Sequence, residues 1–400
     1  MRIIIAGNGL AGTMCAKFLR DGGVDAEIDI YGEEKYLYYP RPNLIEYLAG
    51  NIPYERLYAF QPDWFRNLKL NVHLESPVSR LIPESQEVEV SGSQREHYDQ
   101  LVLATGARSW IPPIKGSESP NVFTFRSLDD CSSLIERLQN RNEVVILGGG
   151  LLGLEIARAV NARGGKVEVV EFFDRLLPRQ LDEDGAFLLK NQIEKLGIGV
   201  HLGQACEEIE ERDGKSGLRF KSGDDLTTES VIIAAGVRPS LELAQNAGLK
   251  ADKGLVVDDY LRTNADNIFG VGDGIQHAGK VYGIIPACFE QARTAAHNIA
   301  GEDIPYEGTV PSNTLKVMGI DVTSVGLVNP EGSEFEAMVL MEEDNLIYKK
   351  IVMKDNVLVG AIWMGTRKGV SEINKLITLK TDIAQWKDTI LDENFDFKAL

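Results

Sequence analysis

Short apolar runs, each closed by small residues, recur along the first three quarters of the chain. They lie at 3–6, 101–104, 144–147, 231–235 and 268–271. Runs of this length are typical of strands buried on both faces, as in a parallel sheet covered by helices. Helices are predicted over Thr13–Arg20, Asn43–Ala49 and Ile285–Ala300, and Ser127 is a predicted helix N-cap. The pattern predicts an α/β fold.

Other segments have the pattern of half-exposed strands. Leu70–Leu74 and Glu87–Val90, with Val78 between them, predict a small β-meander. After Gly308 the chain alternates or is β-branched at 313–317, 322–328, 336–341, 346–353 and 357–364, and Asp355-Asn356 is a candidate hairpin turn. Helices are predicted over 370–379 and 383–391. The last quarter therefore predicts an α+β module with an antiparallel sheet.

The first apolar run leads directly into a glycine-rich turn, Gly7-x-Gly9-x-x-Gly12. In such a turn the first glycine allows the tight bend, the second lets a pyrophosphate approach the backbone, and the third lets helix and strand pack closely. The helix N-terminus offers free N–H groups to phosphates. An acid, Glu33, follows the second strand, where a ribose hydroxyl would be held. The segment predicts dinucleotide binding.

The same pattern returns after 144–147. Gly148, Gly150 and Gly153 fill the three glycine positions, and Glu155 is predicted on the first turn of the following helix. The second strand, Lys166–Val170, ends in Glu171. Two complete fingerprints are far more specific than one, so we expect two bound nucleotides. A carboxylate at 171 would accept hydrogen bonds from a ribose 2′-OH and repel a 2′-phosphate, which favours NADH over NADPH.

Three further strand ends carry small residues or an acid. Leu101–Ala107 and Val231–Gly236 end in turns that allow close approach of a ligand, and Ile268–Asp273 ends in an aspartate. That aspartate caps the following turn or binds a ligand hydroxyl. Arg41 lies between two prolines, and two interpretations stay open for it: a surface arginine, or a cation held near a cofactor.

Composition narrows the class of protein. Four hundred residues suggest two or three domains, and no apolar run is long enough to span a membrane. A net charge of −18 argues against nucleic acid and anionic membranes as partners. The four cysteines, Cys15, Cys131, Cys206 and Cys288, form no local redox or zinc motif, so we predict no metal site and a cytoplasmic location. Because the first predicted strand begins at the second residue, we expect no signal peptide.

Taken in order, the two fingerprints, Leu103–Ala107, Ala234–Gly236 and Gly270–Asp273 resemble the FAD-dependent pyridine nucleotide-disulfide oxidoreductase superfamily over residues 1 to about 300. Tyr38–Pro42 and Ser312–Gly319 are similar to segments of NADH:rubredoxin reductases and of the flavin half of assimilatory nitrite reductases. The resemblance implies two Rossmann-like domains in a glutathione-reductase-like arrangement. A discontinuous FAD domain would span 1–112 and 239–308, an NAD domain 113–238, and an α+β domain 309–400.

The resemblance also implies site residues. The expected FAD contacts are Gly7, Asn8, Gly9, Leu10, Ala11, Gly12, Glu33, Glu34, Arg41, Val78, Ala104, Thr105, Gly106, Arg126, Asp273, Ile285 and Lys316. The expected NAD contacts are Gly148, Gly150, Leu151, Leu152, Gly153, Glu155, Glu171 and Gly236. Glu155, between nicotinamide and flavin, and Arg41, with which it is expected to pair, are the predicted catalytic residues.

Departures from neighbouring families narrow the resemblance. Residues 38–50 contain no cysteine where disulfide reductases and many NADH oxidases carry a reactive one. Leu44-Ile-Glu46 stands where ferredoxin reductases of oxygenase systems have Leu-Ser-Lys, and their Phe-Trp-Ser-Asp stretch is absent. Both differences favour the rubredoxin-reductase branch.

The implied reaction is hydride transfer from the nicotinamide C4 to the flavin N5, then single-electron transfer to a rubredoxin-like carrier. Three alternatives stay open: an input subunit of a nitrite reductase or other metalloprotein complex, an NADH oxidase, and a non-catalytic NADH-sensing protein. The protein is expected to be a monomer or a homodimer.

Overall fold

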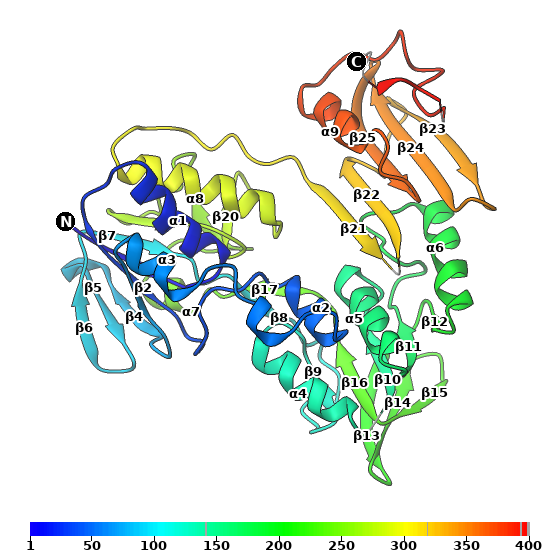
Figure 1. Ribbon diagram of the computed structural model, residues 1–400, viewed down its shortest axis with the longest axis horizontal. Coiled ribbons are helices and arrows are strands. Elements are labelled where there is room, and N and C mark those ends of the chain that lie inside the picture. The colour runs from blue at the N-terminus through cyan, green and yellow to red at the C-terminus, as the bar shows by residue number, and fades with distance from the viewer. Residues whose placement is uncertain (141, 318, 393, 398–400) are drawn as a thin grey trace. The chain divides into compact units, whose positions relative to one another are not determined.

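Four strands from the N-terminal third of the chain and one from residues 268–270 form a parallel sheet in the computed structural model (Figure 1). The strand order is β19 (Ile268–Gly270), β7 (Gln100–Leu103), β1 (Arg2–Ala6), β2 (Glu27–Tyr31) and β3 (Leu70–His73). The three isoleucines of β1 have no exposed surface, as expected for a central strand covered on both faces. The predicted bounds of β2 are confirmed.

The structure describes residues 1–140, 142–317, 319–392 and 394–397, and for 313–317 it describes the backbone alone. Contacts divide the chain into two units. The first comprises 1–47, 52–108 and 237–309, and the second comprises 48–51, 109–236 and 310–400. The first unit is thus assembled from separated segments. The boundaries of the three expected domains stay a prediction.

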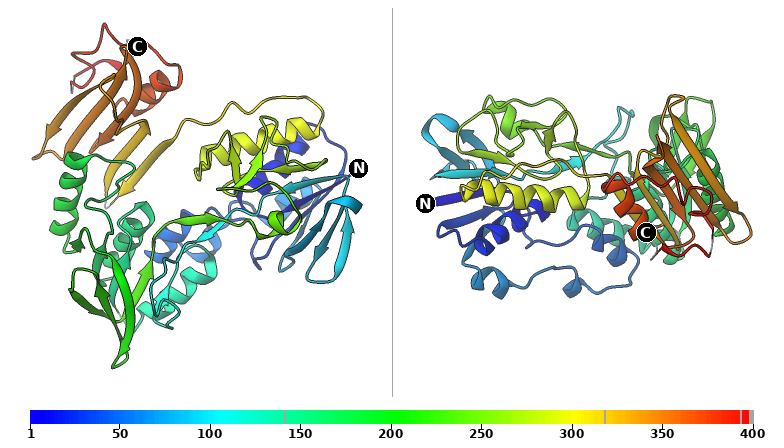
Figure 2. Two further views of the ribbon diagram at one scale, coloured as in Figure 1. Left: turned by 180° about the vertical axis from the view of Figure 1, so that it is seen from behind. Right: turned by 90° about the horizontal axis from the view of Figure 1, so that it is seen from above.

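Two helices lie side by side in the first unit, α1 (Leu10–Asp21) and α8 (Ile285–Ile299), as Figures 1 and 2 show in blue and yellow. A separate antiparallel sheet contains β4 (Val78–Ile82), β5 (Glu87–Val90) and β6 (Gln94–His97). The prediction that Leu70–Leu74 belongs to this meander is wrong. Leu70–His73 pairs in parallel with β2. The pattern of a short alternating strand does not determine which strand it pairs with, so either sheet was compatible with the sequence.

The second unit repeats the parallel arrangement. Its sheet runs β12 (Gly199–His201), β11 (Lys166–Val170), β10 (Glu143–Leu147), β16 (Ser230–Ile233) and β9 (Val122–Phe123). Helix α5 (Leu151–Ala162) follows β10, as α1 follows β1. Helix α4 (Leu128–Leu138) begins after Ser127, whose side chain accepts the backbone N–H of Asp130 in a capping box, so the predicted cap is confirmed.

A second sheet in this unit is antiparallel and has five strands. Its order is β21 (Ser312–Val317), β22 (Ile320–Gly326), β25 (Val357–Met364), β24 (Ile347–Lys354) and β23 (Phe335–Glu342). Asp355 and Asn356 both have positive φ angles, 51° and 60°, which confirms the predicted hairpin turn. Helix α9 (Val370–Thr378) covers one face.

The predicted helix over 383–391 is wrong, because the described residues there form turns that Ile383, Ile390 and Leu391 anchor in the same core as α9. In a segment of only nine residues, these three buried apolar side chains are compatible with turns as well as with a helix.

Residues near α6 (Glu183–Lys195) connect the two sheets of the second unit. Asp182 caps this helix by accepting the N–H of Gly185. Its carboxylate also accepts from the Tyr348 hydroxyl at 2.5 Å and from the Lys350 ammonium at 2.8 Å, both on β24. The antiparallel module is therefore tied to the parallel one by polar contacts.

The remaining elements are short: α2 (Asn43–Leu48), η1 (Tyr54–Arg56), α3 (Pro62–Asn67), η2 (Pro83–Ser85), β8 (Ala107–Ser109), β13 (Cys206–Arg212), β14 (Lys215–Phe220), β15 (Asp225–Thr228), β17 (Val237–Pro239), α7 (Glu242–Asn246), β18 (Leu255–Val257) and β20 (Ile275–His277). Helix α2 confirms the predicted Asn43–Ala49 helix to within one residue.

Candidate functional site

The first glycine turn is packed so tightly that two of its glycines have no room for a side chain. Gly7 has φ +120°, and a Cβ there would lie 2.2 Å from the carbonyl oxygen of Ala104. A Cβ at Gly12 would lie 2.0 Å from the carbonyl oxygen of Gly7. A Cβ at Gly9, in contrast, would meet nothing within 4 Å. Open space at the second glycine is what the close approach of a pyrophosphate requires, so the turn fits a dinucleotide.

The N-terminus of α1 keeps its N–H groups available. Gly9 is its N-cap and has no side chain to accept them, and the first turn contains no acidic residue. The turn itself is braced by Thr13, whose hydroxyl donates to the carbonyl of Asn8 at 3.1 Å. Such a helix end, which also contains the predicted contacts Leu10 and Ala11, attracts phosphate.

Two other predicted segments meet this turn at the carboxyl edge of the sheet. A Cβ at Gly272 would lie 2.8 Å from the Cβ of Ala11, and a Cβ at Gly274 would lie 3.0 Å from the carbonyl oxygen of Gly106. Thr105 donates its hydroxyl to the carbonyl of Ser240 at 3.1 Å. The fingerprint, the Ala104–Gly106 turn and the Asp273 turn are therefore brought together, at the edge where ligands bind open α/β sheets.

The acids after β2 have different surroundings. Glu33 is exposed, whereas Glu34 accepts hydrogen bonds from the Tyr39 hydroxyl and from Arg41 at 2.9 Å. The Arg41 guanidinium also lies 5.8 Å from the centre of the Tyr39 ring. Arg41 is thus held by Glu34 and Tyr39 rather than projecting alone from its proline loop.

Val78 begins β4 and is half-buried. Ser76, two residues earlier, donates its backbone N–H to the carbonyl of Gly32 at 2.8 Å. The start of β4 is therefore joined to the end of β2, beside the predicted ribose acid.

The N-terminus of α8 is the last predicted element of this unit's site. Ile285 is its first residue, is 47% exposed, and follows an N-cap, Ile284, that provides no side-chain cap. Asp273 is partly buried, and the Cys288 thiol donates to its carboxylate over 3.5 Å.

The second glycine turn has the same backbone construction. Gly148 has φ +127°, a Cβ there would lie 2.4 Å from the carbonyl oxygen of Ala234, and a Cβ at Gly153 would lie 1.9 Å from that of Gly148. A Cβ at Gly150 would meet nothing within 4 Å. Leu151 and Leu152 begin α5 directly after Gly150, and Leu152 is 36% exposed.

Glu171 is buried against this turn. One carboxylate oxygen accepts the backbone N–H of Gly149 at 2.6 Å, and the other accepts that of Phe173 at 2.9 Å. These two N–H donors hold the carboxylate in one orientation.

The remaining predicted residues of the second unit lie at element ends. Helix α5 begins at Leu151, so Glu155 is its fifth residue and its predicted place on the first turn is wrong by one residue. The Glu155 carboxylate lies 3.7 Å from the Arg158 guanidinium. Gly236 has φ +103° and its carbonyl accepts the N–H of Trp110. Arg126 directly precedes the cap of α4 and donates its N–H to Asp130 at 2.8 Å. Lys316 lies in β21, and its side chain falls outside the described residues.

Sequence reasoning missed Gln291 and Tyr306, which are 1% and 4% exposed. Gln291 accepts the N–H of Gly272 at 2.8 Å, directly beside the predicted ligand Asp273. The available signal was a glutamine at helical spacing among alanines, three residues after Cys288. The contact of the Asn8 side chain with Gly32 was also not predicted; a Cβ at Gly32 would lie 2.6 Å from that side chain.

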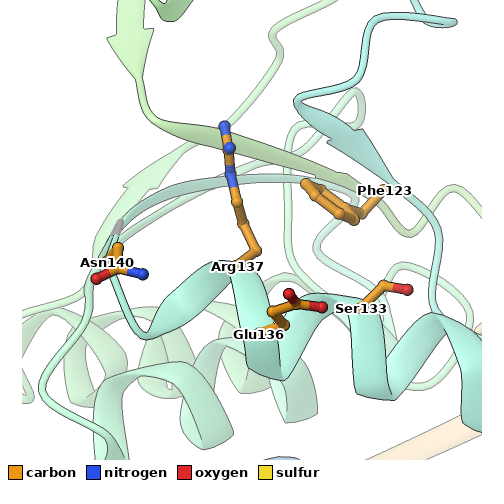
Figure 3. A pocket seen from close by; sticks show the side chains of 5 residues that line it. All are labelled: Phe123, Ser133, Glu136, Arg137 and Asn140. Atoms are coloured by element: carbon orange, nitrogen blue, oxygen red, sulfur yellow. The ribbon is translucent and has the colours of Figure 1, made fainter.

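A surface hollow of about 350 Å³ lies apart from these residues (Figure 3). Phe123, Ser133, Glu136, Arg137 and Asn140 line it. Arg137 donates to Ser230 at 3.1 Å and to the carbonyl of Glu229 at 2.9 Å, so it braces α4 against the sheet. The hollow brings together none of the predicted site residues.

Within the described ranges, no three histidine, cysteine or acidic side chains are grouped to hold a metal ion. The helices that the structure describes include none that is both long and apolar enough to cross a bilayer.

Comparisons with known proteins agree with this geometry. The family model "Pyridine nucleotide-disulphide oxidoreductase" matches residues 1–300, and the model "Rubredoxin NAD+ reductase C-terminal domain" matches 311–381. The chain is 33% identical over 386 residues to a nitrite reductase [NAD(P)H] of Bacillus subtilis, covering 96% of this chain and 48% of the relative.

Two further relatives match over most of their length. An NADH-rubredoxin oxidoreductase of Clostridium acetobutylicum is 29% identical, with 92% of this chain and 93% of the relative covered. The crystal structure of a ferredoxin reductase from Rhodopseudomonas palustris has a TM-score of 0.90 and 25% identity, and covers 100% of this chain and 99% of its own. The chain spans about half the length of the first curated relatives it matches.

These matches confirm the predicted fold class of two Rossmann-like modules with a C-terminal α+β module. The matched family model is also that of the oxidoreductase superfamily that the sequence predicts. The individual site residues stay predictions. The chain belongs to the pyridine nucleotide-disulphide oxidoreductase family.

Proposed function

We propose that this protein takes a hydride from NADH and passes electrons, through FAD, to a small one-electron carrier of the rubredoxin type. The observation that carries the proposal is the pair of glycine turns built on one plan, of which only the second has a buried carboxylate held over its backbone. The C-terminal match to rubredoxin reductases supports the choice of carrier.

In this proposal FAD binds the first unit. Gly7, Gly9 and Gly12 let its pyrophosphate approach the N-terminus of α1, and Glu33 holds the adenosine ribose. Asp273 binds the ribityl chain, since its turn lies against Ala11. The N-terminus of α8, at Ile285, stabilises negative charge that develops on the nearby ring.

NADH binds the second unit. Glu171 accepts the ribose 2′-OH with the oxygen lone pairs that Gly149 and Phe173 leave available. A 2′-phosphate would place two further negative charges beside a buried carboxylate that two N–H groups hold in place. The site therefore selects NADH over NADPH.

When bound, FAD supplies a group that accepts two electrons together and releases them singly. Glu155 positions the nicotinamide against it, and the expected Glu155–Arg41 pair is part of the proposal. Since Arg41 already pairs with Glu34, its net contribution of positive charge at the flavin is reduced. Lys316 is proposed as a second cation at that ring.

A second candidate function has a specific observation in its favour. The chain spans about half of the nitrite reductases and of the nitrate reductase electron transfer subunit that it matches. We therefore keep, as the alternative, an electron-input component for a nitrite reductase or another metalloprotein. An NADH oxidase and an NADH-sensing protein are the two remaining alternatives, and a cytoplasmic location is part of the proposal.

Anaerobic stopped-flow absorbance tests the proposal. The purified protein, reconstituted with FAD, is mixed with NADH or NADPH and then with oxidised rubredoxin. We expect fast bleaching by NADH, slow bleaching by NADPH, and rapid reoxidation by rubredoxin. Because the chain carries −18 and rubredoxins are usually acidic, reoxidation should become faster as salt screens the repulsion.

Each other outcome selects an alternative. Bleaching that rubredoxin does not reverse would refute the carrier, and reoxidation by oxygen alone would favour an oxidase. Reoxidation by a nitrite reductase or another metalloprotein, but not by rubredoxin, would favour the input component. A protein that takes up no FAD would refute the proposal entirely.

A further inference from the structure

Helix α8 holds the Asp273 turn with two side chains that lie one helical turn apart. Cys288 donates to the Asp273 carboxylate, and Gln291 accepts the Gly272 N–H at 2.8 Å. Residues at this spacing share one face of a helix. Gly272 itself has φ +88° and has no room for a Cβ because of Ala11. The turn is therefore fixed from α1 on one side and from α8 on the other.

The hydrogen bonds beyond Gln291 form a chain with a single direction. The Gly272 N–H can only donate, so the Gln291 oxygen faces it and the Gln291 amide N–H₂ faces the Tyr306 hydroxyl, 3.4 Å away. Thr309 donates its hydroxyl to the exposed Glu290 carboxylate, so Tyr306 must donate to Thr309, at 2.6 Å. The chain runs from the buried turn to a surface carboxylate, with each group donating to the next.

Tyr306 is fixed independently of this chain. Its backbone N–H donates to the carbonyl of Asp259 at 2.7 Å, and its ring lies 4.9 Å from that of His277. His277 is 4% exposed and is bonded to the Asp259 carboxylate at 2.9 Å. Tyr306 belongs to the last segment of the first unit, which ends at Thr309. That segment is thus bound to the same turn as Asp273.

We propose that Gln291 and Tyr306 are positioning residues for FAD. Gln291 fixes the backbone at Gly272, and thereby the direction of the Asp273 carboxylate, while Tyr306 fixes the orientation of the Gln291 amide. Neither side chain touches the cofactor in this scheme, and the inference rests on the proposed FAD site of the first unit. It adds to that site the hydrogen bonds that connect the Gly272 turn, through Gln291 of α8, to Tyr306 and Thr309 at the end of the unit.

Titration of the full-length apoprotein with FAD, followed by flavin fluorescence, tests the inference. Gln291→Met keeps the side-chain length but removes the acceptor for Gly272 and the donor to Tyr306. We expect its dissociation constant for FAD to rise about tenfold, and that of Tyr306→Phe to rise about threefold. The vibronic structure of the bound flavin's visible spectrum should change in the same order.

Tyr98→Phe is the matched control. Tyr98 is a fully buried tyrosine of the same unit, and its hydroxyl has no hydrogen-bond partner among the described residues. We expect this variant to bind FAD as the wild type does. Urea unfolding of each apoprotein separates binding from folding, because a purely structural role would lower the midpoint without changing FAD affinity.

The two proposals fail differently. If the wild type binds FAD and the Gln291→Met variant binds it equally well, this inference is overturned and the proposed function stands. A wild type that takes up no FAD would overturn the proposed function. If Gln291→Met does not fold, Tyr306→Phe decides: unchanged FAD affinity in that variant would overturn the inference.

Discussion

At the first glycine turn a side chain from the turn occupies the space beside the end of β2, whereas at the second turn the Glu171 side chain, which follows β11, occupies part of the equivalent space. A Cβ at Gly32 would lie 2.6 Å from the Asn8 side chain. A Cβ at Gly149 would lie 2.6 Å from the Leu176 side chain and 3.1 Å from the Glu171 carboxylate. Asn8 thus lies against Gly32, and Glu171 lies against Gly149, so each of these side chains is accommodated by a glycine.

The backbone around the two pairs is the same. The N–H groups of Gly7 and Gly148 donate to Tyr31 and Val170, each at 2.8 Å. The residues that follow those two strand ends donate to His73 and His201, again at 2.8 Å. The difference therefore lies in the side chains alone.

This exchange changes what each turn presents to a ligand. In the second unit the carboxylate of Glu171 lies directly over the glycine turn. In the first unit Asn8 donates to the carbonyl of Tyr36 at 2.8 Å, and the nearest acid, Glu33, comes one residue later and is exposed. One scaffold thus places the acid after the strand differently in the two units, and with it the two proposed ribose sites.

The largest expected effect comes from breaking the shared backbone. Gly7→Ala forces a positive φ on a residue with a side chain and places its Cβ against the Ala104 carbonyl, so we expect a loss of about 3–5 kcal/mol of unfolding free energy. Gly9→Ala meets open space and should keep the apoprotein's stability while weakening FAD binding. Urea unfolding and FAD titration of both variants check this, and equal stability losses would contradict it.

The next effect tests the carboxylate over the second turn. Glu171→Ala leaves the N–H groups of Gly149 and Phe173 without their acceptor and removes the proposed ribose ligand. We expect the dissociation constant for NADH to rise about 10–100-fold, and the preference over NADPH to shrink. Glu171→Gln keeps an acceptor and should lose less. Isothermal titration with both nucleotides decides, and FAD affinity should not change in either variant.

A smaller effect tests the exchange itself. Gly32→Glu should clash with Asn8, whereas Asn8→Gly should leave a gap, and the double variant should recover part of both losses. We expect a coupling free energy of about 1–2 kcal/mol in a double-mutant cycle measured by urea unfolding. Additive losses would show that the two positions do not share one space.

The sequence predicted what depends on local pattern. Glycines at 7, 12, 148 and 153 are required by contacts that every strand–turn–helix of this kind makes, so their roles followed from spacing. The Ser127 cap and the Asp355-Asn356 turn depend on three or four neighbouring residues.

The features that the sequence did not predict depend on contacts between distant segments. Asn8 and Gly32, or Gln291 and Tyr306, lie far apart in the chain, and nothing in either segment states the distance between them. Strand β3 was assigned to the wrong sheet for the same reason, because a register is a property of two strands.

The smallest expected effect compares the buried carboxylate of Asp29 in the first unit with the partly buried one of Asp182 in the second. Burial by itself would raise the pKa of Asp29, but hydrogen bonds from His73 and Arg2 outweigh it and hold the pKa below its usual value. For Asp182, burial would also raise the pKa, but hydrogen bonds from Lys350 and Tyr348 outweigh that effect. The pKa of Asp182 is therefore lowered as well.

A carboxylate whose pKa is lowered in the folded state stabilises the protein at pH values above its unfolded-state pKa. This stabilisation is lost as the pH falls through the folded-state pKa. Both carboxylates should therefore make the protein less stable as the pH drops below about 4, the ordinary range of an aspartate. Asp182→Asn keeps a cap for α6 but loses the charge opposite Lys350, so it should cost about 0.5–1.5 kcal/mol at pH 7 and less at pH 3. Urea unfolding across this pH range measures the difference. A cost that does not fall with pH would mean that Asp182 acts as a cap alone, and that the antiparallel module is held to the parallel one by its other contacts.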